Sequence, residues 1–507
     1  MVVKGNDEKV LHEEHLNGSY SDSEIVIGLV GAVGTELTAI KQIITDRLAT
    51  FHYSSEEIRI SQDIICLFED IPADLSNYDK ANALMSAGNT IREKSGDNSI
   101  LALAAASQVS CIREQYSTSN DDPEPLRRKA FIISSLKHPE EVQKLRTIYS
   151  RGFYLIGIHS SEISRRDFLI ANKGMSEIEA NRLIERDADE SDKHGQHTRD
   201  TYHLSDFFID YGSNRHKAQY DIWRTLDLMF GKPFVTPTFD EFAMFMAFSS
   251  SLRSADLSRQ VGAVMTKNKN IIATGANDIP QAGGGLYWPD YDSKGEKIVD
   301  KEDGRDWVRG YDSNAREKKM IINEILETLP DDELKEPLRK LLNSSRIKDI
   351  TEYGRVVHAE MEAILACARS DISTKDADLY CTTFPCHNCA KHIVASGIKR
   401  VVYVEPYPKS KALDFHSDSI TLESNDGKSV RFEPFVGVGP RSFYDLFSTN
   451  LGAGYPIKRK DSDGDAVKWK ESEAVLRMQM LSTSYIERET AAASAVSEYR
   501  SKYNETK

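Results

Sequence analysis

Cysteine is scarce in this chain, which has 507 residues and only six cysteines. So few cysteines exclude the dense disulfide framework of small secreted domains. Cys386 and Cys389 nevertheless form a Cys-x-x-Cys pair beside other candidate ligands, which favours metal chemistry in a reducing cytoplasm. The remaining four are Cys66, Cys111, Cys367 and Cys381.

Long apolar runs and an excess of basic residues are also lacking. No stretch approaches the roughly 18–20 apolar residues that a membrane span needs, so we expect no membrane partner. Residues 1–20 are polar and mixed in charge, which predicts a flexible tail rather than a secretory signal. The chain has 65 Lys and Arg against 79 Asp and Glu, a net charge of −14. Nucleic-acid binding depends on basic surfaces, so this balance favours a small-molecule substrate, although local basic patches stay open.

The N-terminal part predicts an α/β domain over residues 21–235. Ile25–Val30 is a β-branched run that leads into glycines, and Glu36–Leu48 has helical apolar spacing. A strand, a glycine-rich turn and a helix form a βα unit of the phosphate-binding type. We expect further buried parallel strands at three apolar runs, Ala130–Ser134, Phe153–Ile158 and Phe207–Ile209.

A second α/β domain is predicted over residues 238–450. Thr238 and Glu241 have capping-box spacing and open a helix. Two apolar runs flank a polar turn and predict a hairpin, Val261–Met265 with Ile271–Thr274. A helix with His358, a strand, a helix from Pro385 and another strand follow. A charged, partly helical insertion at about 281–353 interrupts this domain, and residues 451–507 predict a linker and a helical tail.

The strongest chemical signal is the group His358, Glu360, Cys386 and Cys389. A catalytic zinc keeps three protein ligands and leaves the fourth position for water, and one His with two Cys fits that number. Pro385 opens a helix whose N-terminus stabilises thiolates. Zinc lowers the pKa of water toward neutrality, and Glu360 would carry protons to the ring nitrogen and the leaving ammonia. This order of residues is the signature of zinc nucleobase deaminases.

A structural zinc site is the alternative. Such a site needs a fourth ligand, and His387 or His392 lies near enough in the sequence to serve. A structural site has no use for Glu360, however, so we favour the catalytic interpretation.

Residues 238–450 also resemble the deoxycytidylate (dCMP) deaminase family. The resemblance implies that Asn277 contacts the sugar or base, that Tyr407 covers the base, and that Arg259 and Lys409 contact phosphate. A turn role for Asn277 and solvated surface roles for the two cations stay open. The matching stretches are Ser258-Arg-Gln-Val-Gly-Ala-Val, Thr274-Gly-Ala-Asn-Asp-Ile-Pro, His358-Ala-Glu-Met-Glu-Ala-Ile and Thr383-Phe-Pro-Cys-His-Asn-Cys.

The N-terminal glycine loop lacks the lysine of a working Walker A motif. Four candidate nucleotide-binding residues lie there, and they are Gly28, Gly31, Gly34 and Thr35. Glycine N–H groups at a helix start can still hold a phosphate. Ser135–Val142 and Gly195–Thr201 resemble segments of nucleotide-kinase-type P-loop domains. We therefore expect a degenerate kinase-like domain that binds a nucleotide or regulator, with a purely structural domain as the alternative.

The two domains together resemble the bacterial anti-phage dCTP deaminases over residues 21–450. The resemblance implies a P-loop kinase-like α/β domain followed by a cytidine-deaminase-like α/β/α domain. It also implies zinc-dependent conversion of dCTP and dCMP to dUTP and dUMP, antiviral nucleotide depletion, and homo-oligomers such as hexamers. In part of that family a small regulatory RNA inhibits the enzyme, which this sequence leaves open.

Three other functions stay open. A housekeeping dCMP deaminase would prefer the monophosphate and need no kinase-like domain. A nucleic-acid editing deaminase would need basic grooves and aromatic platforms. A non-enzymatic nucleotide or RNA sensor would keep zinc for structure only and would not need Glu360.

Overall fold

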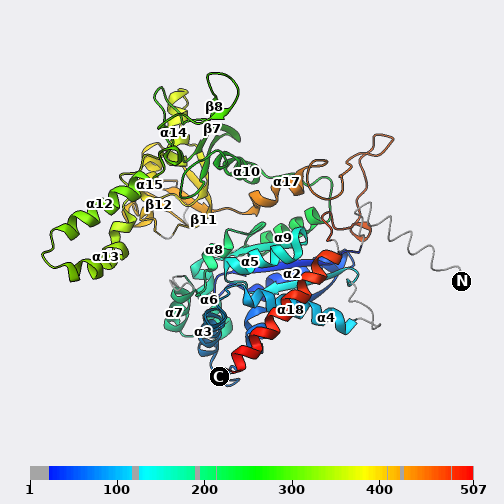
Figure 1. Cartoon of the computed structure of the whole chain (residues 1–507). Helices are drawn as coiled ribbons and strands as arrows, with labels where there is room; N and C mark the ends of the chain where they lie inside the picture. Colours follow the sequence, from blue (N-terminus) through cyan, green and yellow to red (C-terminus); the bar gives the residue numbers. More distant parts are fainter. Residues whose placement is uncertain are drawn as a thin grey trace. The chain divides into compact units, whose positions relative to one another are not determined.

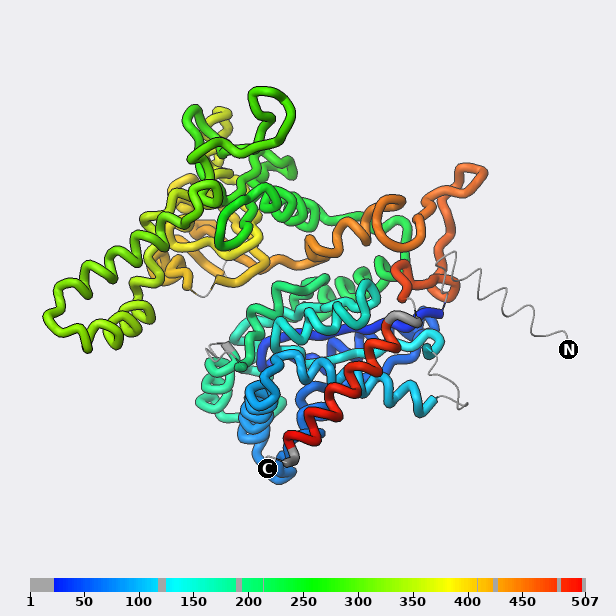
Figure 2. The backbone as a smooth tube through the Cα atoms, in the orientation of Figure 1, coloured from blue at the N-terminus to red at the C-terminus, as the bar shows by residue number. Residues whose placement is uncertain are grey.

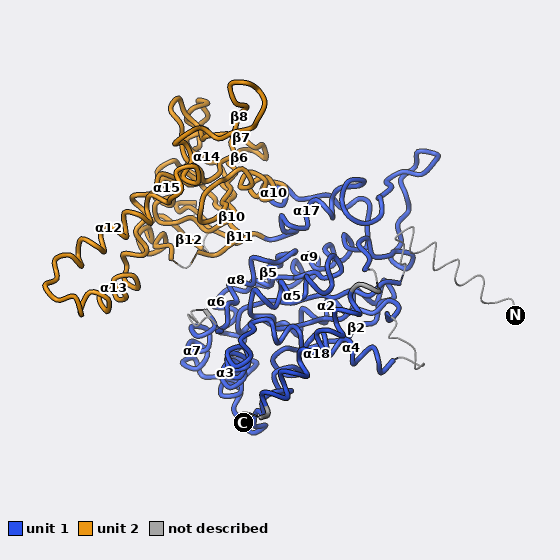
Figure 3. The backbone as a smooth tube through the Cα atoms, in the orientation of Figure 1, with its two compact units in different colours: residues 1–241, 436–507 blue, residues 242–435 orange. Residues whose placement is uncertain are grey.

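The computed structural model describes residues 22–116, 125–188, 194–212, 214–407, 409–422, 427–480 and 482–505. The predicted flexible tail, residues 1–20, lies outside the described residues. The chain divides into two compact units, unit 1 (residues 1–241 and 436–507) and unit 2 (residues 242–435) (Figure 3). Within the described ranges, no helix is both long and apolar enough to cross a membrane.

Unit 1 contains a six-stranded sheet in the order β14-β5-β4-β1-β3-β2. Five strands are parallel, and only the short β14 runs antiparallel to its neighbour β5. The four strands predicted in this region are confirmed. The bounds are β1 (Ile25–Gly31), β2 (Ser54–Arg59), β3 (Lys129–Ser134), β4 (Phe153–His159), β5 (Phe207–Asp210) and β14 (Gly437–Val438).

Helices cover both faces of this sheet (Figure 1), as a mostly parallel sheet requires. Alternate residues of β1 point to opposite cores: Val26 and Val30 pack in one cluster, and Ile27 and Leu29 in the other. The predicted helix after the glycine loop is confirmed as α2. The helices are α2 (Leu37–Thr50), α3 (Asn77–Ser95), α4 (Ile100–Tyr116), α5 (Pro139–Tyr149), α6 (Glu162–Lys173), α7 (Glu177–Ala188), α8 (Thr198–Tyr202), α9 (Arg215–Met229), α17 (Pro440–Phe447) and α18 (Ser482–Glu505).

Residues 436–450 correct the predicted domain boundary, because they belong to unit 1 and not to the deaminase-like part. Val438 and Gly437 pair with β5 and extend its sheet. In α17, the Ser442 hydroxyl donates to the buried Asp206 carboxylate over 2.8 Å. Pairing with the edge strand β5 therefore places residues 436–450 in unit 1.

The C-terminal helix α18 lies along α4 (Figures 1 and 2) and completes unit 1. A helical tail was predicted there, but it is part of this core and not a free extension. The fully buried Arg113 of α4 pairs with Glu24, over 2.9 Å, and with Glu489 of α18. Tyr485 of α18 donates to the same Glu24 over 2.7 Å. A buried cation with two carboxylates holds α18 to the start of the chain.

Unit 2 is built on a second six-stranded sheet in the order β12-β13-β11-β10-β6-β7. The predicted hairpin is confirmed as β6 and β7, whose turn residues Asn268 and Lys269 have φ of 50° and 57°, as a type I′ turn needs. The strands are β6 (Gly262–Lys267), β7 (Asn270–Ala276), β10 (Asp378–Thr383), β11 (Arg400–Glu405), β12 (Ile420–Thr421) and β13 (Val430–Pro434).

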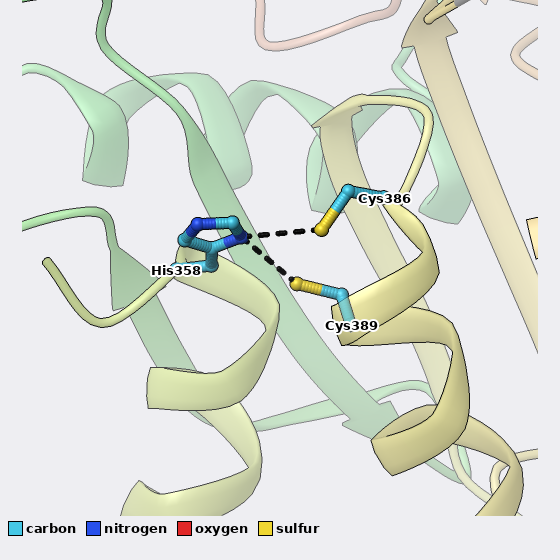
Figure 4. A group of neighbouring side chains, drawn as sticks. All are labelled: His358, Cys386 and Cys389. Atoms are coloured by element: carbon cyan, nitrogen blue, oxygen red, sulfur yellow. Dashed lines mark hydrogen bonds between the residues drawn. The ribbon is translucent and has the colours of Figure 1, made fainter. Parts of the chain in front are cut away.

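Three helices of unit 2 are α10 (Phe239–Ser251), whose first residues belong to unit 1, α14 (Ala359–Arg369) and α15 (His387–Ala395). The capping box that opens α10 is confirmed: Glu241 N–H donates to the Thr238 hydroxyl over 3.2 Å, and Thr238 N–H donates to the Glu241 carboxylate over 2.6 Å. Helix α14 packs on β6 and β7, and α14 also contacts α15. The two helices therefore bring their N-terminal ends to one side of the sheet (Figure 4).

The insertion at 281–353 is partly helical, as predicted. Figure 2 shows α12 and α13 extending from the rest of unit 2 as a helical hairpin. Its base is held by the buried Arg305, which pairs with Asp278 over 3.2 Å. The elements are β8 (Asp290–Tyr291), β9 (Ile298–Val299), α11 (Asp306–Arg309), α12 (Ser313–Glu327), α13 (Lys335–Ser344) and the 3-10 turn η5 (Arg346–Asp349).

Candidate active site

Two helix N-termini carry the three candidate ligands of unit 2 (Figure 4). His358 is the N-cap of α14, and Cys386 is the N-cap of α15. Cys389 lies in the first turn of α15. The prediction started this helix at Pro385, but it begins at His387, which leaves the Cys386 backbone extended. Both sulfurs still lie where free backbone N–H groups stabilise negative charge.

The three side chains converge closely enough to hold one metal ion. Nδ1 of His358 lies 3.3 Å from Sγ of Cys386 and 3.3 Å from Sγ of Cys389. Tetrahedral zinc with ordinary Zn–N and Zn–S bonds separates such atoms by about 3.6 Å. The imidazole nitrogen and the two sulfurs therefore fit zinc, with a fourth position left for water.

A fourth protein ligand is not found among the described residues. The only group of His, Cys, Asp or Glu there that could hold a metal is His358 with the two cysteines. His387 and His392 are not part of it. The structural-site alternative therefore lacks the extra ligand that it requires.

Glu360 is buried beside this group in the first turn of α14 and is 4% exposed. Burial raises the pKa of its carboxyl, against the lowering effect of His358. A hydrogen bond from Cys389, assisted by His358, lowers the pKa of Cys386 to about 3. The site thus combines a thiolate, an imidazole and a carboxyl that can hold or release a proton.

A cavity of about 660 Å³ opens onto Glu360, His358 and Cys386. The cavity is large enough for a nucleotide, since small-molecule sites usually measure about 300–1,000 Å³. It brings together all four residues that the resemblance assigned to the substrate, which are Arg259, Asn277, Tyr407 and Lys409.

The Asn277 side chain braces the wall of this cavity. Its Oδ1 accepts from Val261 N–H over 2.7 Å, and its Nδ2 donates to the Arg259 carbonyl over 2.8 Å. The residue is buried, so both bonds are shielded from water. Asn277 therefore fixes the segment that precedes β6, whatever further contact it makes.

We expect Asn277→Ala to lower the free energy of unfolding by about 1–3 kcal/mol, because a buried N–H and a C=O lose their partners. Urea denaturation followed by intrinsic fluorescence measures this. Asn270→Ala in the hairpin turn is the control, since its amide bonds only an exposed carbonyl. Equal stability of the two variants would contradict the bracing role.

The other three substrate candidates form a polar wall. The Arg259 guanidinium lies 4.9 Å from the centre of the Tyr407 ring and pairs with Glu405 over 3.2 Å. Lys409 pairs with Asp349 of η5 over 3.5 Å. The aromatic ring and the two cations therefore face the same cavity as Glu360.

Several residues that line the cavity were not predicted from the sequence, and two of them, Arg346 and Lys411, bear positive charge. Lys411 could have been found, because it lies two residues after Lys409. Arg346 gave no signal, since it lies inside the charged insertion and only the fold returns it to the site.

The N-terminal glycine loop of unit 1 agrees with its prediction only in part. Gly28 is not a loop residue: it lies within β1, where an added Cβ would be 2.7 Å from the Phe153 ring. Gly31 ends the same strand. Gly34 does lie in the loop with φ +86°, and Thr35 N–H closes a turn onto the Ala32 carbonyl over 3.0 Å.

A carboxylate of the chain itself occupies the N–H side of this loop. Val33 N–H donates to the buried Asp187 over 2.8 Å. Lys137 donates to Asp187 and to the Gly31 carbonyl, each over 2.9 Å. Thr198 also donates to Asp187, over 3.1 Å. Asp187 thus accepts from a loop N–H group and from a lysine, two donors that can also bind an anion.

Comparison with known proteins connects the site to a family. Residues 237–405 match the family described as the cytidine and deoxycytidylate deaminase zinc-binding region. The deoxycytidylate deaminase of enterobacteria phage T4 is 33% identical over 168 residues, 33% of this chain and 77% of that protein. That of Schizosaccharomyces pombe is 24% identical over 302 residues, 58% of this chain and 75% of that protein. The latter stretch is longer than unit 2 and so extends into unit 1.

Among solved structures, the dCMP deaminase of cyanophage S-TIM5 in its apo form is similar. It is 19% identical, covers 40% of this chain and 100% of that chain, and has a TM-score of 0.23. The segment matched by the family model includes all four residues of the candidate metal and proton-transfer site.

Proposed function

Because the chain belongs to the deoxycytidylate deaminase family, a family of zinc-binding hydrolases that act on C–N bonds, we propose that it deaminates dCTP and dCMP. The products are dUTP or dUMP and ammonia. One observation carries this proposal: the buried Glu360 lines one cavity of nucleotide size together with His358 and Cys386 of the metal-ligand cluster.

In this proposal His358, Cys386 and Cys389 hold the zinc ion. Zinc bound there lowers the pKa of water toward neutrality. Glu360 takes the proton that the attacking water releases and gives it to N3 of cytosine. The water oxygen joins C4 and gives its second proton to Glu360, Glu360 passes that proton to the amino group, and ammonia leaves as the C4 carbonyl forms. A carboxyl whose pKa is raised by burial is suited to this alternate gain and loss of a proton.

The cavity wall supplies the substrate contacts. We propose that Tyr407 covers the base, that Asn277 contacts the sugar or base, and that Arg259 and Lys409 contact phosphate. The exposure of Arg259 and Lys409 supports the phosphate contacts, because Glu360, which the base must reach, is buried. A nucleotide that enters base first leaves its phosphates at the exposed end.

The test is to incubate the purified, zinc-loaded protein with dCMP, dCTP or a cytosine-containing single strand. We expect uracil nucleotides from both mononucleotides and no change in the strand, as resolved by chromatography. Deamination of the strand alone would favour an editing enzyme, and no conversion of any substrate would refute the proposal.

A housekeeping dCMP deaminase is the second candidate. The similarity to proteins named deoxycytidylate deaminase favours it. It predicts a kcat/KM for dCMP well above that for dCTP, so the same assay with both substrates separates the two functions.

We propose antiviral nucleotide depletion as the role of the dCTP activity. Unit 1 supports a regulated enzyme, because the chemistry above uses residues of unit 2 only. Expression of the protein in phage-infected bacteria should lower plaque number, and a Glu360→Gln variant should not.

The expected oligomer, such as a hexamer, and an inhibitory small RNA belong to the same proposal. Size-exclusion chromatography with light scattering, before and after nuclease treatment, tests both.

For unit 1 we propose a degenerate P-loop kinase-like domain whose glycine loop binds the phosphates of a nucleotide in competition with Asp187. Asp187→Ala removes the acceptor of Val33 N–H and the carboxylate partner of Lys137, which keeps the Gly31 carbonyl. The variant should therefore bind ATP at least about tenfold more tightly, as titration calorimetry measures. Asp167→Ala, on the neighbouring α6, is the control. Equal ATP affinities of the two variants would contradict this proposal and favour a purely structural role for unit 1.

A further inference from the structure

We propose that the insertion supplies a phosphate-binding residue, Arg346, which selects the triphosphate over the monophosphate. This inference rests on the proposed deaminase function and goes beyond it, because it assigns the preference for dCTP to one residue. Arg346 is exposed, begins the turn η5 and lines the same cavity as Glu360.

Three contacts join the turn that carries Arg346, and the residues just after it, to neighbouring segments. Asn314 of α12 donates to the Ile350 carbonyl over 2.7 Å. Asn388, between the two zinc-site cysteines, donates to the Thr351 hydroxyl over 3.3 Å. Lys409 pairs with Asp349 over 3.5 Å. The insertion is therefore tied to the metal-binding helix and to the cationic wall at the point where Arg346 faces the cavity.

Arg346 differs from the other cations of the cavity in having no carboxylate partner among the described residues. Arg259, Lys409 and Lys411 each pair with a carboxylate, at 3.2, 3.5 and 3.0 Å. Within the described part of the chain, no ion pair involves Arg346.

Apart from the buried Glu360, the carboxylates on the cavity wall already have partners. Asp349 and Asp414 pair with lysines. Three others accept from backbone N–H groups, and they are Asp256, Asp312 and Glu352. Arg346 is therefore the cation most available to an added anion.

The position of Arg346 fits the outer phosphates. The reacting base must reach Glu360, which is 4% exposed, while Arg346 lines the same cavity and is exposed. A guanidinium binds phosphate oxygens in pairs, which suits the β- and γ-phosphates of a triphosphate. In this proposal the α-phosphate lies near Arg259, because its guanidinium is 4.9 Å from the ring centre of Tyr407, the residue proposed to cover the base.

Steady-state kinetics of Arg346→Gln on dCTP and dCMP tests this inference. We expect kcat/KM for dCTP to fall about tenfold to hundredfold, the effect of one charged hydrogen-bonding group. The loss should come from a higher KM with kcat unchanged, because Arg346 contacts the part of the substrate that does not react. The value for dCMP should stay unchanged, and Arg346→Lys should restore part of the dCTP activity.

Lys348→Gln is the matched control, because Lys348 is an exposed cation of the same turn that does not line the cavity. Equal losses for dCMP and dCTP, or the same loss in both variants, would overturn the inference. An unchanged protein that converts dCMP but not dCTP would also overturn it and leave the deaminase intact. An unchanged protein inert on both would instead refute the proposed function.

Discussion

Glu360→Gln is expected to lower kcat for dCMP and dCTP by about 10³–10⁴-fold without loss of zinc. The amide has nearly the size of the carboxyl, so the buried position at the start of α14 stays filled. It cannot take a proton from water or give one to the leaving amine, and proton transfer by a positioned side chain contributes up to about 10⁴-fold. Product formation by chromatography and zinc content by atomic spectroscopy measure the two properties separately.

Glu362→Gln is the control for this prediction. Glu362 lies two residues further along the same helix and is also buried, but it pairs with Arg369 and does not line the cavity. Its variant should keep activity. If Glu360→Gln remained active, the proton transfer would belong to another group, and the deaminase mechanism argued above would be wrong.

The zinc site could be predicted because its residues are close in sequence. His358 and Glu360 share the start of one helix, and Cys386 and Cys389 share the start of another, so two short segments contain all the chemistry. The family match then confirms a cytidine-deaminase-like fold for this part of the chain. The strands of unit 1 were predictable for a similar reason, since buried parallel strands form apolar runs.

Contacts between distant segments could not be predicted. Val438 joins β5 through a strand of two residues, which has no periodic pattern. Asp187 meets Val33 across 154 residues of chain. Arg346 reaches the cavity because backbone and amide contacts fix a turn that has no apolar signal of its own. In each case the partner is determined by tertiary packing, and spacing along the sequence does not reveal it.

Gly28 shows the opposite error, in which a familiar pattern is present but its meaning differs. The glycine spacing suggested a phosphate-binding loop, yet Gly28 lies in β1. A glycine is needed there because the Phe153 ring and the Leu136 side chain leave no room for a Cβ. Only Gly34, with its positive φ, has the conformation that such a loop requires. Single glycines are therefore weaker predictors than the paired ligand motifs of unit 2.

Cys386→Ser is expected to abolish zinc binding and deaminase activity together. A serine hydroxyl stays protonated near neutral pH. At Cys386, hydrogen bonds from Cys389 and His358 outweigh the effect of burial, which raises the pKa of the thiol, and lower that pKa to about 3, so the thiolate is favoured. Only His358 and Cys389 would remain, one ligand fewer than a catalytic zinc keeps. Zinc content should fall from one per chain toward zero, and chelation of the unchanged protein should reproduce the loss.

The same substitution should lower thermal stability, because zinc binds the folded site and not the unfolded chain. Metal present at about a thousand times its dissociation constant stabilises by about 4 kcal/mol, which corresponds to roughly 10 °C in a unit of this size. Cys381→Ser is the control: Cys381 is buried on β10 and donates to the Val402 carbonyl, a bond that a hydroxyl can also make. It should keep zinc and activity. A Cys386→Ser protein with full zinc and normal turnover would mean that the ligands lie elsewhere.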